Sequence, residues 1–173
     1  MIRILALGDS YTIGEAVAPE QRWVEQWAAL LRAEGHAIAQ PVTVIAKTGW
    51  STDELQSGIR EYGPRAQFDL ATLLIGVNNQ YRGRTVENYH EEFSELLDTA
   101  CAAVNGRAER VQVLSIPDWG RTPFGLNSGR DLDAISTEID AFNHTAETLC
   151  QSRGVAFLDI TDLTRERQTD PAM

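Results

Sequence analysis

The sequence is short of positive charge. Its 173 residues contain 15 Lys and Arg against 25 Asp and Glu, so the net charge is −10. Nucleic acids and anionic membrane surfaces are bound through clustered Lys and Arg. The composition therefore predicts a protein with no nucleic-acid partner, whose acidic residues are spread over a solvated surface.

Long apolar runs are also missing, and none approaches the ~20 residues that a membrane-spanning helix needs. The apolar stretch at residues 1–7 is too short for a signal peptide, so we expect a cytoplasmic protein. Only two cysteines occur, Cys101 and Cys150, without the spacing of a metal site. Both lie in apolar helical patterns, which favours buried thiols over a disulfide.

Phosphate-binding signatures are absent. No Gly-x-Gly-x-x-Gly follows the first predicted strand, and no Walker-type lysine is present, so neither a dinucleotide fold nor a P-loop is expected. No His, Cys and Asp cluster has the spacing of metal ligands. We expect neither a metal nor an organic cofactor.

The sequence does contain a regular alternation of strand and helix patterns. Short apolar runs predict five strands, at residues 2–7, 42–46, 68–75, 111–116 and 155–160. Between them, apolar spacings of three and four predict helices, at residues 20–34, from 51 onward, 85–104 and 132–149. This pattern predicts one domain over residues 1–173: an α/β/α three-layer sandwich with a flavodoxin-like, doubly wound, five-stranded parallel sheet.

Details of this pattern give sharper expectations. In the first helix the spacing predicts one inner face, made of Trp23, Val24, Trp27, Leu30 and Leu31. Residues 51–54 read Ser-Thr-Asp-Glu, a capping box that starts the next helix. Residues 118–130 are expected to form a long loop, and no helix is expected after the fifth strand.

Three loops that follow strands carry residues suited to acyl transfer. Ligands of such sheets bind at the carboxyl ends of the strands, where Ser10, Gly49 and Asn78 are expected. A serine hydroxyl becomes a nucleophile when a base removes its proton. The oxyanion that then forms needs fixed hydrogen-bond donors. The N–H groups of Ser10 and Gly49 and the side-chain amide of Asn78 are candidates for these donors.

Four aromatic residues lie on or near the same loops, at Trp50, Tyr81, Trp119 and Phe124. Their position suits the wall of a pocket that holds the acyl group of the substrate. It equally suits core packing or the anchoring of loops.

The motifs resemble those of the SGNH (GDSL) hydrolase family. Residues 8–14 read Gly-Asp-Ser-Tyr-Thr-Ile-Gly and are similar to the family's first block, GDSxTxG. Gly49 resembles the second block, and residues 76–79, Gly-Val-Asn-Asn, resemble the third, GxND. The resemblance implies a serine esterase with Ser10 as nucleophile, Gly49 and Asn78 in the oxyanion hole, and Asp9 and Asn79 in support. Asp9 is expected to organise its loop rather than to carry a proton.

Two departures from the family pattern stand out. Asn79 replaces the usual Asp of the third block, which changes a supporting position. The last block, Asp-x-x-His, which supplies the catalytic histidine and the acid that orients it, does not occur. The histidines that do occur, His36, His90 and His144, are poorly placed in the predicted fold, and an ion pair with Asp140 is expected for His144. We therefore expect the natural chain to continue beyond Met173.

The resemblance predicts hydrolysis of small-molecule carboxylic esters, with short-chain acyl or acetyl esters favoured, through an acyl-enzyme on Ser10. Without the histidine, the chain as given is expected to have little activity. The alternative is a pseudo-hydrolase that binds an acyl or carbohydrate ligand without turnover. A flavodoxin-like module that binds another small ligand is a third reading, but it does not explain three matching loops.

Overall fold

A parallel five-stranded sheet forms the centre of the molecule. The computed structural model describes residues 1–63 and 67–167. The strands are β1 (Ile4–Gly8), β2 (Thr43–Ala46), β3 (Leu70–Leu74), β4 (Val111–Leu114) and β5 (Ala156–Leu158). They pair in the order β2-β1-β3-β4-β5, and every pair is parallel. The predicted flavodoxin-like order is confirmed, with each strand shorter than its apolar run.

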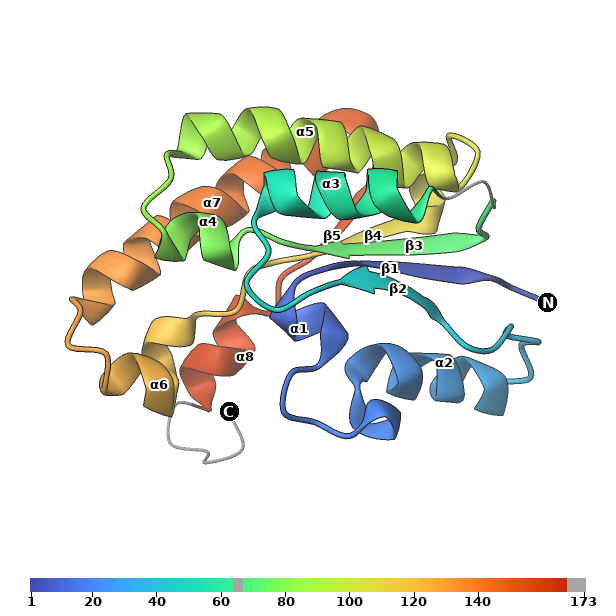
Figure 1. Ribbon diagram of the computed structural model, residues 1–173, viewed down its shortest axis with the longest axis horizontal. Helices are drawn as coiled ribbons and strands as arrows, with labels where there is room; N and C mark the ends of the chain where they lie inside the picture. Colours follow the sequence, from blue (N-terminus) through green and yellow to red (C-terminus); the bar gives the residue numbers. More distant parts are fainter. Residues whose placement is uncertain (64–66, 168–173) are drawn as a thin grey trace.

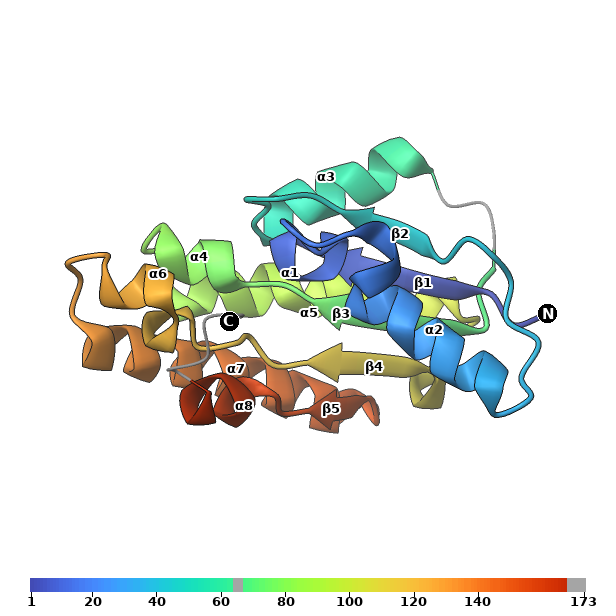
Figure 2. The ribbon, with the colours of Figure 1, turned by 90° about the horizontal axis from the view of Figure 1, so that it is seen from below.

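Helices cover both faces of this sheet (Figures 1 and 2). One face carries α3 (Thr52–Tyr62), α5 (Val86–Ala103) and α7 (Leu132–Arg153). The helices α1 (Ser10–Ile13), α2 (Trp23–Ala33) and α8 (Thr161–Glu166) lie on the opposite side. The remaining short segments are α4 (Val77–Tyr81), α6 (Pro123–Leu126) and the 3₁₀ turns η1 (Pro19–Gln21), η2 (Ala108–Arg110) and η3 (Trp119–Arg121).

The two faces bury cores of different size, because successive residues of a strand point to opposite faces. Leu5 and Leu7 of β1 join the large core under α3, α5 and α7. Ile4 and Ala6 point the other way, into a small core under α2. The predicted stripe of α5 is buried in the large core. These two cores on one sheet confirm the α/β/α sandwich.

The start of α3 follows the sequence prediction. Glu54 Oε2 accepts a hydrogen bond from the Ser51 N–H at 2.9 Å, and the capping box is complete. The helix ends at Gly63, which takes a left-handed φ of +58°. The capping box therefore fixes the N-terminus of α3 directly after the loop that follows β2.

Several local expectations were wrong. Leu30 of α2 is 65% exposed rather than on the inner face, because Val24, Ala28 and Leu31 turn toward the small core and Leu30 lies to one side of the face that they form. A helix, α8, does follow β5, and Arg165 ties it to the buried Asp118 at 2.9 Å. The expected loop 118–130 contains η3 and α6, each capped by the side chain before it.

The two cysteines are free thiols, Cys150 buried and Cys101 half-buried. Within residues 1–63 and 67–167, every helix is too short or too polar to cross a bilayer. The expectation that the natural chain continues beyond Met173 concerns the C-terminal end, where residues 168–173 lie outside the described residues.

Candidate active site

Three strand ends bring the predicted residues into one cavity. Ser10 is the first residue of α1, directly after β1. Gly49 lies in the loop after β2, and Asn78 lies in the first turn of α4, after β3. The cavity has a volume of about 300 Å³ and its walls are formed by ten residues: Ser10, Tyr11, Glu15, Thr48, Gly49, Val77, Asn78, Tyr81, Trp119 and Phe124.

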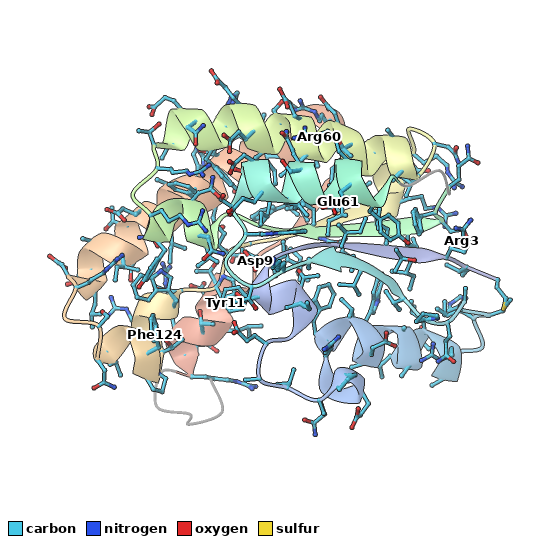
Figure 3. The ribbon with its side chains drawn as sticks, in the orientation of Figure 1. Arg3, Asp9, Tyr11, Arg60, Glu61 and Phe124 are labelled. Atoms are coloured by element: carbon cyan, nitrogen blue, oxygen red, sulfur yellow. The ribbon has the colours of Figure 1, made fainter. Side chains whose placement is uncertain are left out.

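The turn that presents Ser10 is tight, and its motif residues each meet a packing demand. Asp9 caps α1, where its Oδ1 accepts from the Tyr11 N–H at 3.0 Å. A Cβ on Gly8 would lie 2.1 Å from Thr12 Oγ1 and 2.4 Å from the Leu74 carbonyl oxygen, so only glycine fits. Figure 3 shows Asp9 and Tyr11 at the end of β1, with Phe124 further out on α6.

Asp9 is fully buried, and its role differs from that of the residues that line the cavity. Its Oδ2 has no hydrogen-bond partner in the part of the chain that the structure describes. Burial raises the pKa of the Asp9 carboxyl to about 7, although the Tyr11 N–H opposes the shift. Asp9 therefore titrates near neutral pH while it organises the turn beneath Ser10.

Gly49 occupies the third position of a β-turn that spans residues 47–50. The Trp50 N–H donates to the Lys47 carbonyl at 3.2 Å and closes the turn. Gly49 has a φ of +84°, the left-handed value that this position of a type II turn requires. A Cβ there would meet nothing within 4 Å, so the backbone conformation, rather than space, favours glycine. The Gly49 N–H belongs to the central peptide of the turn, and it makes no hydrogen bond within the turn.

Asn78 is held by the neighbouring loop. Its Nδ2 donates to the Trp50 carbonyl at 2.9 Å, which leaves the second amide hydrogen for a ligand. Before it, Gly76 has a φ of +129°, and a Cβ there would lie 2.6 Å from the Tyr89 ring. The α4 helix can therefore start directly after β3 with Asn78 in its first turn.

Asn79, which replaces the family's Asp, is buried and takes part in a hydrogen-bond relay. Its Oδ1 accepts from the Thr52 N–H at 3.1 Å, and its Nδ2 donates to Thr52 Oγ1 at 2.6 Å. The Thr52 hydroxyl then donates to the Glu92 carboxylate. An aspartate at position 79 has no N–H group, so it would have to accept a hydrogen bond from the Thr52 hydroxyl. The amide reverses that bond, and Glu92 supplies the acceptor that the reversed hydroxyl needs.

Three of the four candidate aromatic residues form one wall of the cavity. The ring centroids of Tyr81 and Trp119 are 5.3 Å apart, and those of Trp119 and Phe124 are 5.8 Å apart. The Trp119 indole donates to Gln80 Oε1 at 2.7 Å. The guanidinium of Arg130 lies 4.2 Å from the centroid of the Tyr81 ring. Aromatic contacts, the Trp119–Gln80 hydrogen bond and the cation–π contacts of Arg130 with Tyr81 and Trp119 thus hold this wall together.

Trp50 is the exception, and its placement corrects the expectation. Its indole covers Gly58 of α3, where a Cβ would lie 2.2 Å from the ring. It contributes to a separate hollow beside β2 together with Tyr62. The small Gly58 makes room for the ring, and Trp50 is not among the residues that line the Ser10 cavity. Only the Trp50 backbone, through its carbonyl, takes part in the site.

The sequence interpretation missed several residues of the site. Tyr11, Glu15, Thr48 and Val77 line the cavity beside the motif residues. Their proximity to the motifs in the sequence was the available signal. Arg82 also lies close to the third block, but nothing in the sequence shows that its Nη2 donates to the Gly49 carbonyl at 2.6 Å, because that partner lies 33 residues away.

No histidine lines this cavity among the described residues. His36, His90 and His144 are all exposed. The expected ion pair of His144 is not formed, because the Asp140 carboxylate instead binds Arg165 at 2.7 Å. Over the same described residues, no group of three or more His, Cys, Asp and Glu side chains is placed to hold a metal ion.

Comparisons with known proteins identify the family from the sequence and the fold from solved structures. The model of the GDSL-like lipase/acylhydrolase family matches residues 6–173. A lipase/acylhydrolase from Enterococcus faecalis has a similar structure, with a TM-score of 0.73 and 20% identity over 94% of this chain and 78% of that chain. A mutant of an acetyl-xylooligosaccharide esterase from Geobacillus gives a TM-score of 0.75 and 17% identity over 98% of this chain and 80% of that chain.

A lipolytic G-D-S-L protein from Veillonella parvula gives a TM-score of 0.70 and 18% identity over 98% of this chain and 84% of that chain. The sequence matches none of the curated proteins compared with it. At these identities the structural likeness shows the fold, and the family match extends over nearly the whole chain. The chain belongs to the GDSL-like lipase/acylhydrolase family of SGNH hydrolases.

Proposed function

We propose that this protein hydrolyses carboxylic esters of small molecules through an acyl-enzyme on Ser10. The observation that carries the proposal is the convergence of Ser10, Gly49 and Asn78 on one cavity. These three residues come from three different strand ends, and an ordinary turn serine would need no such companions. The family match supports ester hydrolysis in general, and the residue roles below are our proposal.

In the first half-reaction, Ser10 Oγ attacks the carbonyl carbon of the ester while a base removes its proton. The electron pair of the C=O bond moves to the oxygen. The N–H groups of Ser10 and Gly49 and the amide of Asn78 donate to that oxyanion. The Ser10 N–H is available because the first N–H groups of a helix have no acceptor within it.

Collapse of the tetrahedral intermediate breaks the bond to the leaving alcohol, which takes the proton from the base. Water then attacks the acyl-enzyme in the same way, releases the acid and restores the Ser10 hydroxyl. We propose that the base is the histidine of an Asp-x-x-His segment that is not among residues 1–173. Each of these steps uses only side chains, backbone N–H groups and water, so the scheme calls for no metal or organic cofactor.

The dimensions of the cavity support short acyl groups. Its volume of about 300 Å³ lies at the lower end of the range for small-molecule sites. Tyr81 and Phe124 are 40% and 63% exposed, so the aromatic wall is open to solvent rather than closed into a tunnel for a long chain. We therefore favour acetyl and other short-chain esters as substrates.

The test is hydrolysis of p-nitrophenyl acetate by three proteins: residues 1–173, the protein expressed from the complete reading frame, and its Ser10→Ala variant. We expect hydrolysis by the product of the complete reading frame and its loss in Ser10→Ala, with residues 1–173 weaker by orders of magnitude. If none of the three exceeds buffer, the ester-hydrolase proposal fails for this substrate class, and the acyl- or carbohydrate-binding pseudo-hydrolase replaces it.

A further inference from the structure

We propose that Arg82 is a positioning residue that holds the oxyanion loop, residues 47–50, in its working conformation. The proposal rests on the proposed function, because it assigns Arg82 to the Gly49 donor of that reaction. Arg82 directly follows α4, the helix that carries Asn78. Its guanidinium crosses to the loop, where Nη2 donates to the Gly49 carbonyl at 2.6 Å.

The oxyanion loop needs such a contact because of its glycine. Glycine is conformationally permissive, so a turn with glycine at its third position can move its peptide planes at little cost. Within the turn only the Trp50 N–H bond to the Lys47 carbonyl, at 3.2 Å, restrains residue 49. A charge-assisted bond from Arg82 to the Gly49 carbonyl adds a second restraint on the peptide that joins Gly49 to Trp50. It narrows the range of Gly49 backbone torsions, and with it the range of directions open to the Gly49 N–H.

Arg82 is itself anchored on the opposite side. Its Nη1 donates to Glu54 Oε2 at 3.0 Å and to Ser51 Oγ at 3.3 Å. Glu54 is held by the capping box of α3, and the Ser51 N–H bond, helped by Arg82, lowers the pKa of the Glu54 carboxyl. Glu54 therefore stays ionised at neutral pH, and the guanidinium is held between two fixed acceptors.

A second bond makes the arrangement two-point. Asn78 Nδ2 donates to the Trp50 carbonyl at 2.9 Å, so two successive carbonyls of the oxyanion loop accept from the α4 segment. Asn78 provides one bond and Arg82 the other. Both residues belong to the same short segment, so the loop that carries the Gly49 N–H is fixed relative to the amide of Asn78. The distance between these two donors matters because both donate to the same oxyanion in the proposed mechanism.

The chain offers a matched control in Arg84. It lies two residues further along, is also partly exposed, and pairs with Asp53 at 2.7 Å and Glu92 at 3.5 Å. It makes no contact with the carbonyls of the oxyanion loop within the described residues. Replacing Arg84 thus removes the same charge and a comparable ion pair from the same surface without freeing Gly49.

Two measurements test the proposal on the protein from the complete reading frame and its Arg82→Ala and Arg84→Ala variants. The first is steady-state hydrolysis of p-nitrophenyl acetate. Removal of one oxyanion donor costs about 10²–10³ in kcat, so loss of its positioning should lower kcat about tenfold or more and leave KM within about threefold. Arg84→Ala should change kcat by less than about twofold.

Chemical rescue extends this measurement. Because the side chain of Arg82 is partly exposed, free guanidinium at sub-denaturing concentration should restore part of kcat in Arg82→Ala and leave Arg84→Ala unchanged.

The second measurement is the ¹⁵N order parameter of the Gly49 amide, which does not depend on catalysis. We expect a rigid value of about 0.85 in the parent and in Arg84→Ala, and a value below about 0.6 in Arg82→Ala. Thermal unfolding of each variant checks that the fold is kept. If Arg82→Ala fails to fold, Glu54→Gln weakens the anchor of the same guanidinium and should shift both readouts in the same direction by less.

The two proposals fail in different ways. If Ser10→Ala does not reduce hydrolysis, the proposed function is wrong, and the order parameter alone then decides whether Arg82 holds the loop. If hydrolysis depends on Ser10 but Arg82→Ala and Arg84→Ala share the same kcat, or if the Gly49 order parameter is unchanged in Arg82→Ala, the positioning role is overturned.

Discussion

The two walls of the Ser10 cavity are built from different interactions. The polar wall, formed by the oxyanion loop and the start of α4, is fixed by directional hydrogen bonds to Arg82, Asn78 and the α3 cap. The aromatic wall, formed by Tyr81, Trp119 and Phe124, is held mainly by ring contacts around the buried Trp119, and its Tyr81 and Phe124 side chains are exposed to solvent. The polar wall therefore holds hydrogen-bond donors at fixed positions, whereas the aromatic wall offers an apolar surface for contact.

This difference separates two tasks. Hydrogen bonds to an oxyanion depend steeply on distance and angle, so in the proposed mechanism the polar wall stabilises the transition state. Apolar contact is non-directional and depends on area, so in the same mechanism the aromatic wall binds the substrate. Substitutions on the polar wall should therefore change kcat, and those on the aromatic wall should change KM.

The largest effect is expected for Asn78→Ala. It removes one proposed oxyanion donor and the bond to the Trp50 carbonyl together. We expect kcat for p-nitrophenyl acetate to fall by about 10²–10³, with KM nearly unchanged. A fall of less than about threefold in kcat would mean that the polar wall does not contact the oxyanion.

The buried Asp9 offers a test beneath both walls. Its folded pKa of about 7 is raised above its ordinary value of 3.8 by burial. Its contribution to stability is thus fully present below about pH 4 and is lost as pH rises through about 7. Asp9→Asn keeps a cap for the Tyr11 N–H but cannot titrate. As the pH rises over this interval, we expect the free energy of unfolding of the wild type to fall by on the order of a few kcal/mol relative to that of Asp9→Asn. Urea unfolding of both proteins at several pH values measures this difference. Parallel pH profiles for the two proteins would contradict the raised pKa.

The relay behind the polar wall can be broken by Asn79→Asp. The new carboxylate would accept the hydrogen bond from the Thr52 hydroxyl, and Glu92 would lose that donor and face a second negative charge. We expect the free energy of unfolding to fall by about 1–3 kcal/mol. The double variant Asn79→Asp with Glu92→Gln should recover most of that loss, because the glutamine removes the second charge. A double variant no more stable than the single one would show that Glu92 does not compensate for Asn79.

The smallest effect is expected on the aromatic wall, for Phe124→Ala. Because the side chain is 63% exposed, stability should change by less than about 0.5 kcal/mol. Lost contact area should raise KM by about threefold to tenfold for aryl and short acyl esters, with kcat within about twofold. A fall in kcat at constant KM would break the division of tasks between the two walls.

The parts of the site that were predictable are those set by the sheet. Parallel strands place their carboxyl ends together, so the positions of Ser10, Gly49 and Asn78 in three such loops implied a common cavity. Sequence order placed these three residues in the loops, and the φ of +84° at Gly49 is a local preference of glycine. The bond from Asn78 Nδ2 to the Trp50 carbonyl, which joins two of the loops, could not be predicted in this way.

The parts that were not predictable depend on distant partners. Trp50 follows Gly49 directly, yet its direction is set by the space over Gly58 on α3. Arg82 contacts a backbone carbonyl 33 residues earlier, which leaves no pattern in the sequence. Periodicity describes one element at a time and does not contain this information.

The most direct test of the Ser10 assignment is covalent labelling of the protein from the complete reading frame with diethyl p-nitrophenyl phosphate, followed by intact mass and peptide mass spectrometry. We expect a single diethylphosphoryl group on Ser10, formed at a rate that falls in Asn78→Ala and is zero in Ser10→Ala. Labelling of a different residue, or full esterase activity in a protein whose Ser10 is unlabelled after treatment, would contradict the proposed active site.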